Sequence, residues 1–139
     1  MTKQAIGNET DPERKVKRLI KFVSEYVEDS LADNALTVLA VCKNKKGDCT
    51  EHSLLFTSMA RAAGIPCRTV GGFIYEGDDT KTFSGHAWNE VILDGHWQPV
   101  DSTWDEFKIN PTHIQIKEES NLEFLSLGMK TRLLDLKTK

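Results

Sequence analysis

The chain has 139 residues, a mass of 15.7 kDa and a formal net charge of −3, with 39 % hydrophobic and 28 % charged residues. This size predicts a single domain, residues 1–139, with one core. The slight negative charge disfavours general binding to nucleic acid or to anionic membranes. No stretch approaches the roughly 18 consecutive apolar residues of a membrane span, and the start lacks the apolar region of a signal peptide. We therefore expect a soluble chain, cytoplasmic, or extracytoplasmic if it is a piece of a longer exported protein.

The cysteines are three in number, Cys42, Cys49 and Cys67. An odd count at irregular spacing argues against a disulfide framework, so at least one thiol stays free. We expect no cofactor, and the oligomeric state is left open. Residues 1–10 are polar and without a pattern, and we expect them to be flexible.

An amphipathic helix is predicted from Asp11 to about Ser30. Asp11 is a capping residue, and Pro12 suits the first helical position. The apolar positions that follow have helical spacing: Val16, Leu19, Ile20, Val23 and Val27. Residues 34–41 could form a short helix or a buried strand, because so short a run does not distinguish the two.

The strongest helix signal follows Gly47. Asp48 and, three positions later, Glu51 form a capping-box pattern, and Gly64 marks the end of the helix. The helix therefore carries Cys49 in its first turn, and its predicted apolar stripe comprises Leu54, Leu55, Met59, Ala62 and Ala63.

A helix N-terminus favours a negative charge and therefore the thiolate of Cys49, which is the nucleophilic form of cysteine. The acidic neighbours Asp48 and Glu51 oppose this charge. The helix end alone is therefore not expected to stabilise the Cys49 thiolate, and we expect a cationic partner such as a histidine.

Strands are predicted after this helix, at 67–75 and, beyond a polar loop at 76–82, at 86–93 and 96–102. The Asp-Gly pair at 94–95 is a strong hairpin signal. The later signals are weaker: 113–116 alternates like a strand, and 122–136 is apolar but too broken to assign.

The hairpin can be given a register. A two-residue turn places Leu93 opposite His96 and, by continuation, Trp88 opposite Asp101. His86 is then diagonal to Asp101 on the same face of the sheet, within reach of a hydrogen bond between carboxylate and imidazole. One extra residue in the loop or a bulge would place the two on opposite faces.

Cys49, His86 and Asp101 together provide a nucleophile, a base and a carboxylate that orients the base, as in catalytic triads that transfer acyl groups. His52 competes as the base, since it lies three residues after Cys49 on the same helix. A structural zinc site is a further alternative, with Cys42, Cys49, His52 and Cys67 as ligands. The remaining histidines, His96 and His113, are interpreted as structural or surface residues. The three tryptophans are interpreted as part of the core or of the wall of a cleft: Trp88, Trp97 and Trp104.

Four ordered blocks carry a resemblance to a known family: GDCTEHSLL at 47–55, RAAGIPCR at 61–68, GHAWNEV at 85–91 and WQPVDST at 97–103. Together they resemble the transglutaminase-like superfamily, in particular its prokaryotic branch. The family's nucleophile, histidine and aspartate would fall on Cys49, His86 and Asp101.

The resemblance implies an α+β papain-like core, in which a helix bearing Cys49 packs on an antiparallel sheet carrying His86 and Asp101. It implies a cysteine peptidase or amidase, or a transglutaminase-like acyltransferase, with a peptide or protein amide as substrate. The stretch before Cys49 lacks the tryptophan of the animal crosslinking enzymes, which favours hydrolysis over calcium-regulated crosslinking. A non-catalytic peptide-binding module that retains the fold is the alternative.

Overall fold

The computed structural model describes residues 1–31, 35, 37–79, 81–116 and 130–132. The chain forms two compact units, one from Met1–Thr69 and Trp88–Ile109, the other from Val70–Ala87 and the chain from Asn110 onward. Strands β3 (Cys67–Tyr75) and β4 (Thr82–Leu93) contribute residues to both units. That the whole chain folds as one domain stays a prediction.

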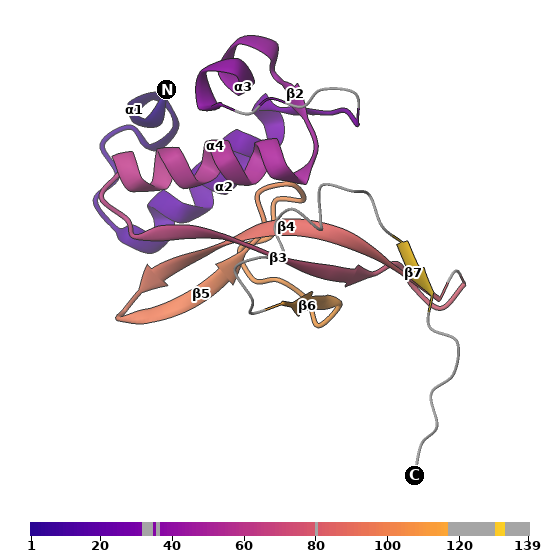
Figure 1. Cartoon of the computed structure of the whole chain (residues 1–139). Coiled ribbons are helices and arrows are strands. Elements are labelled where there is room, and N and C mark those ends of the chain that lie inside the picture. Colours follow the sequence, from indigo (N-terminus) through magenta and orange to yellow (C-terminus); the bar gives the residue numbers. More distant parts are fainter. Residues whose placement is uncertain (32–34, 36, 80, 117–129, 133–139) are drawn as a thin grey trace. The chain divides into compact units, whose positions relative to one another are not determined.

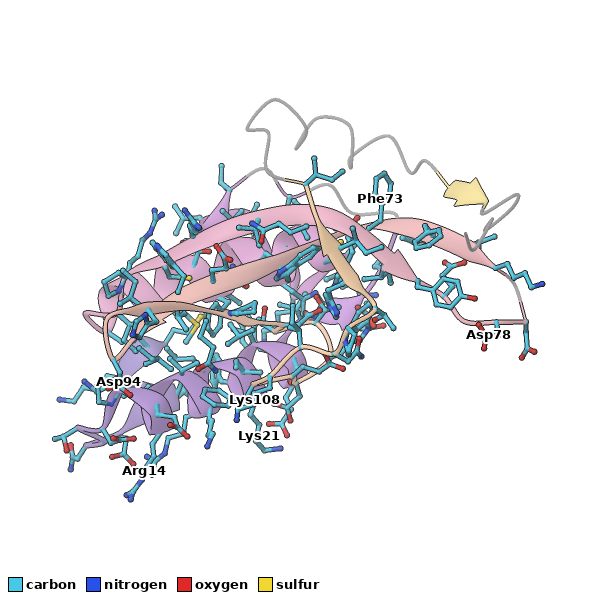
Figure 2. The ribbon with its side chains drawn as sticks, turned by 90° about the horizontal axis from the view of Figure 1, so that it is seen from below. Arg14, Lys21, Phe73, Asp78, Asp94 and Lys108 are labelled. Atoms are coloured by element: carbon cyan, nitrogen blue, oxygen red, sulfur yellow. The ribbon has the colours of Figure 1, made fainter. Side chains whose placement is uncertain are left out.

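The first unit contains the helices α1 (Thr2–Ile6), α2 (Pro12–Tyr26), α3 (Val38–Asn44) and α4 (Cys49–Ala62). Helix α2 starts as predicted, since Asp11 Oδ2 accepts a hydrogen bond from Arg14 N at 2.8 Å, but it ends at Tyr26, before the expected Ser30. Its charged side chains, Arg14 and Lys21 among them, point outward (Figure 2).

Two further helices refine the sequence expectations. Residues 38–44 are helical and not a strand, and the Thr37 hydroxyl caps this helix by accepting from Ala40 N at 3.2 Å. Helix α1 lies in the segment that showed no pattern. Its Ala5 and Ile6 pack on the core, a tertiary contact that two apolar residues in a polar stretch do not reveal.

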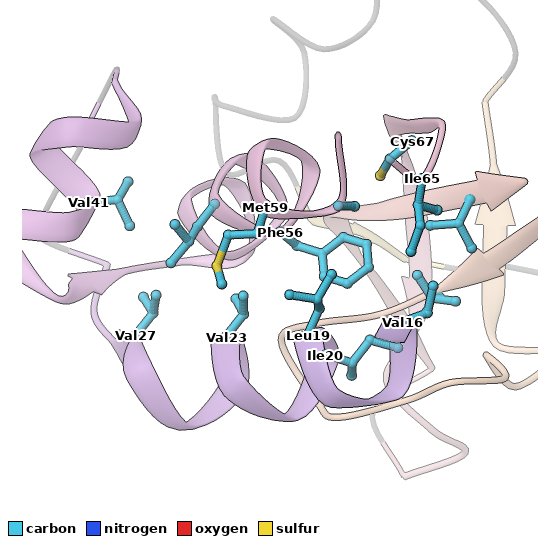
Figure 3. Close-up of a cluster of buried hydrophobic side chains, with 14 of the residues drawn as sticks. Val16, Leu19, Ile20, Val23, Val27, Val41, Phe56, Met59, Ile65 and Cys67 are labelled. Carbon is cyan, nitrogen blue, oxygen red and sulfur yellow. The ribbon is translucent and has the colours of Figure 1, made fainter. Parts of the chain in front are cut away.

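The core lies where α2 and α4 run side by side (Figure 1). Val16, Leu19 and Val23 of α2 meet Phe56 and Met59 of α4, each at most 3 % exposed (Figure 3). Burial of each such side chain stabilises the fold by roughly 1.5–3 kcal/mol.

The predicted apolar stripe of α4 is partly wrong. Ala62 is exposed and Leu54 only half-buried, whereas Phe56 and Ala60 are fully buried. The reason is that α4 packs on α2 and also contacts β4, where Asn89 Nδ2 donates to the carbonyl oxygen of Ser53 at 3.1 Å, so that a single stripe does not describe it.

Strand β5 (His96–Val100) pairs with β4 in the predicted antiparallel register, with Leu93 opposite His96 and Asn89 opposite Val100. The turn fits an Asp-Gly pair, because Asp94 and Gly95 both have positive φ, 50° and 79°. Figure 2 shows Asp94 at the tip of this hairpin.

In the second unit, β6 (His113–Gln115) pairs antiparallel with the end of β3, which confirms the strand predicted at 113–116. Strand β7 (Lys130–Arg132) pairs with the start of β4. The hydrogen-bonded order is β5-β4-β3-β6, with β7 beside β4. The rest of the unassigned stretch 122–136 lies outside the described residues.

A short parallel pair, β1 (Glu28–Asp29) and β2 (Lys46–Gly47), joins the end of α2 to the segment that enters α4. Among the helices in the described part of the chain, none is long and apolar enough to cross a membrane.

Candidate active site

Cys49 is the first residue of α4 and is half-buried. The predicted capping box is confirmed: the Asp48 carboxylate accepts from Thr50 N at 2.7 Å, and the Glu51 carboxylate accepts from Asp48 N at 2.9 Å. These two side chains satisfy backbone donors of the first turn and so fix the position of the cysteine.

Glu51 also ties this turn to the loop before α3. Its second carboxylate oxygen accepts from Ala35 N at 2.8 Å, and the side chain is only 4 % exposed. Burial raises the pKa of the Glu51 carboxyl above its ordinary value. Gly47 leaves room for this side chain, because a Cβ on Gly47 would lie 2.3 Å from Cβ of Glu51.

His52 is a buried structural residue. It is 1 % exposed, and its ring nitrogens lie 2.8 Å from the Asp48 carbonyl oxygen and 3.1 Å from the Val27 carbonyl oxygen. The Asp29 carboxylate lies 4.0 Å from Nε2. A ring engaged by two carbonyl groups and closed to solvent is poorly placed to exchange protons with a substrate, which argues against His52 as the base.

The side chains of the alternative zinc site have other partners. His52 is engaged as described, and the Cys42 Sγ lies 3.8 Å from Met1 Sδ. The buried Cys67 Sγ contacts Thr57 Oγ1 at 3.7 Å, and burial raises the pKa of its thiol to about 11. Among the described residues, the side chains grouped closely enough to hold a metal ion do not include Cys42, Cys49, His52 or Cys67, so the arrangement does not support this alternative.

Asp101 directly follows β5 and is fully buried. Its carboxylate accepts from Thr103 N at 2.7 Å, and its backbone exchanges two hydrogen bonds of 2.8 Å with Glu106. The acid is therefore held by its own turn in a fixed orientation.

His86 lies on the part of β4 that belongs to the second unit and is 3 % exposed. The ring of His113 stands edge-on to it, with 5.6 Å between the ring centroids. His113, interpreted from the sequence as a structural or surface histidine, thus has the ring of His86 as a neighbour. The contact depends on β6 pairing with β3, and no local signal in the sequence gives that pairing. His96, in contrast, is exposed as expected.

The tryptophans differ from one another. Trp88 is buried, as expected for the core, but Trp97 and Trp104 are 42 % and 45 % exposed. The guanidinium of Arg68 lies 4.2 Å from the centre of the Trp97 ring and binds the Glu90 carboxylate at 2.7 Å. Trp97 thus lies at the surface, with the Arg68 guanidinium over the face of its ring.

A capped helix that begins with a half-buried cysteine and packs beside an antiparallel sheet is the α+β, papain-like arrangement that was predicted. Residues 1–102 match the model of the family described as the transglutaminase-like superfamily. The chain belongs to this superfamily.

Individual relatives are similar over part of their length. Kyphoscoliosis peptidase of Homo sapiens is 34 % identical over 106 residues, which cover 68 % of this chain and 16 % of that protein. The mouse protein of the same name is 38 % identical over 77 residues, 52 % of this chain and 12 % of that protein. The chain thus spans less than a fifth of the length of these relatives.

Solved structures share the fold. A candidate cysteine protease from Cytophaga hutchinsonii superimposes with a TM-score of 0.66 and 20 % identity, over 76 % of this chain and 36 % of that chain. The periplasmic domain of TgpA from Pseudomonas aeruginosa gives a TM-score of 0.61 and 23 % identity, over 76 % and 43 % of the two chains. Because the similar proteins include animal and bacterial ones, the assignment to a prokaryotic branch stays a prediction.

Proposed function

We propose that this chain is a cysteine-nucleophile enzyme that cleaves or transfers amide bonds of peptides or proteins, with Cys49, His86 and Asp101 as its catalytic residues. The observation that carries the proposal is the position of Cys49 at the start of a capped helix, in a chain that belongs to the transglutaminase-like superfamily. The register of the β4–β5 hairpin, confirmed from Asn89 to Leu93, supports the pairing of His86 with Asp101.

In the proposed reaction the Cys49 thiolate attacks the carbonyl carbon of the amide, while the backbone N–H of Cys49 is a candidate donor to the oxyanion. The His86 imidazolium then gives its proton to the departing nitrogen, which leaves as an amine. The thioester on Cys49 is resolved when His86 removes a proton from the incoming water or amine, and the thiolate leaves. Asp101 orients the imidazole and stabilises its charged form.

Hydrolysis is the favoured outcome. The relatives of Homo sapiens and Mus musculus are named peptidases, and the Cytophaga hutchinsonii protein is a candidate cysteine protease. We extend this activity to the present chain as part of the proposal, with water as the usual acceptor of the acyl group.

Alkylation by iodoacetamide near neutral pH tests the activated thiolate. We expect Cys49 to react much faster than Cys42 and Cys67, and Cys49→Ala to abolish the fast phase, whereas the matched Cys42→Ala variant retains it. Three thiols that react equally slowly would contradict the proposal. Unchanged peptide affinity in Cys49→Ala, with no turnover by the wild-type protein, would indicate the non-catalytic module instead.

A further inference from the structure

Asn89 is a fully buried polar residue of the first unit. It lies on β4, three residues after His86, and is 0 % exposed. Its Nδ2 donates to the carbonyl oxygen of Ser53 at 3.1 Å and to Thr57 Oγ1 at 2.9 Å, and its Oδ1 accepts from Ser102 Oγ at 3.5 Å. One amide therefore joins β4 to α4 and to the turn that follows β5.

The partners of this amide are also buried. Ser53 and Ser102 are 0 % exposed and Thr57 is 7 % exposed. Thr57 Oγ1 extends the network to Thr69 Oγ1, 3.0 Å away on β3. Such a network is directional, so it fixes the distance and angle between the elements, which apolar packing alone does with less specificity.

The elements joined are the ones that carry the proposed catalytic residues. Ser53 lies four residues after Cys49, one helical turn along α4. Ser102 directly follows Asp101, whose own carboxylate is held by Thr103 N at 2.7 Å. An aliphatic residue at this inward position of β4 would fill the core, but it could not hold the helix and the turn in one register.

We propose that Asn89 is a positioning residue for the reaction: its amide sets the spacing between the helix that bears Cys49 and the turn that bears Asp101. This inference rests on the proposed function. Catalytic geometry tolerates little error, since a misplacement of about 1 Å can reduce a rate by about a hundredfold.

The test compares Asn89→Leu, which keeps the number and branching of the side-chain heavy atoms but not the hydrogen bonds, with the milder variants Thr57→Val and Ser102→Ala. Val16→Ala is the control, because Val16 is a core residue of α2 with 0 % exposure and lies outside the network. The readouts are the ratio of Cys49 to Cys42 alkylation within one protein, kcat and KM on a peptide amide, and unfolding in urea.

For Asn89→Leu we expect the alkylation ratio and kcat to fall by between about tenfold and a hundredfold, with KM within about threefold of the wild-type value. In Thr57→Val and Ser102→Ala the alkylation ratio and kcat should also fall, but by a smaller factor. Val16→Ala should lose stability and keep both the ratio and kcat in its folded fraction.

A folded Asn89→Leu protein with wild-type ratio and kcat overturns the role of Asn89 and leaves the proposed function standing. If Asn89→Leu does not fold, Thr57→Val and Ser102→Ala replace it in the test. Wild-type alkylation ratios and kcat values in these two folded variants then overturn the role of Asn89. A wild-type protein with neither selective alkylation nor turnover overturns the proposed function and this inference together.

Discussion

Gly47→Ala is expected to disrupt the turn that presents Cys49. The added Cβ would lie 2.3 Å from Cβ and 2.4 Å from Cγ of Glu51, far inside any contact that real side chains make. Rotating the Glu51 side chain cannot relieve this overlap, because its Cβ is fixed by the α4 backbone. The backbone of the entry turn must therefore move.

The movement breaks one or both hydrogen bonds of the Glu51 carboxylate, to Asp48 N at 2.9 Å and to Ala35 N at 2.8 Å. Hydrogen bonds to a charged group contribute roughly 1.5–3 kcal/mol each. We therefore expect Gly47→Ala to lower the free energy of unfolding by roughly 2–5 kcal/mol. With a urea m-value of about 1–3 kcal/mol/M, the midpoint falls by about 1 M or more.

Urea unfolding followed by far-UV circular dichroism measures this loss, and iodoacetamide alkylation of the folded protein should show a slower Cys49. Gly64→Ala is the control, since a Cβ there meets nothing within 4 Å and its cost, about 1–2 kcal/mol, comes from the positive φ of 80°. A Gly47→Ala protein as stable as wild type, with Cys49 equally reactive, would refute the reasoning.

Three further predictions concern buried groups. Because burial raises the pKa of Cys67 to about 11 from an ordinary 9.0, its alkylation at pH 8 should be about a hundredfold slower in the native protein than in urea, and equal rates would contradict the burial. His52→Leu should lower the free energy of unfolding by roughly 1–3 kcal/mol, measured in urea, since the ring contacts to the carbonyl oxygens of Asp48 and Val27 are lost. The variant should keep the fast alkylation of Cys49 that His86→Ala abolishes; loss of that phase in His52→Leu alone would make His52 the base. Since the pKa of Glu51 is raised by burial, its contribution to stability is full below its ordinary pKa of 4.5 and is lost as pH rises through the raised value. The stability of wild type relative to Glu51→Gln should therefore fall as the pH rises above the ordinary pKa of 4.5 in urea titrations, and a rise would show that the carboxylate is instead stabilised on folding.

The local features of the fold were predictable because their signals lie within a few residues. The cap at Asp48 and Glu51, the start of α2 at Asp11 and the Asp-Gly hairpin each follow from short-range chemistry, and the structure confirms them. The β4–β5 register followed in turn, since a two-residue loop fixes it.

The features that were missed depend on residues far apart in the chain. The contact of His113 with His86 requires β6 to pair with β3, and the burial of His52 requires the carbonyl group of Val27, 25 residues away. The partners of Asn89 likewise come from α4 and from the turn after β5. Periodicity shows that a residue faces inward, but it does not show what the residue meets there.

The burial of α4 has a consequence for the motions of the chain. Its residues from Glu51 to Ala60 are buried at all but two positions, Leu54 and Ser58, which are half-buried. Backbone amides in so enclosed a helix exchange with deuterium chiefly when the surrounding core comes apart, so local fraying contributes little. Cys49 lies two residues before this buried stretch on the same helix, so the reactivity of its sulfur atom should persist until the first unit itself unfolds.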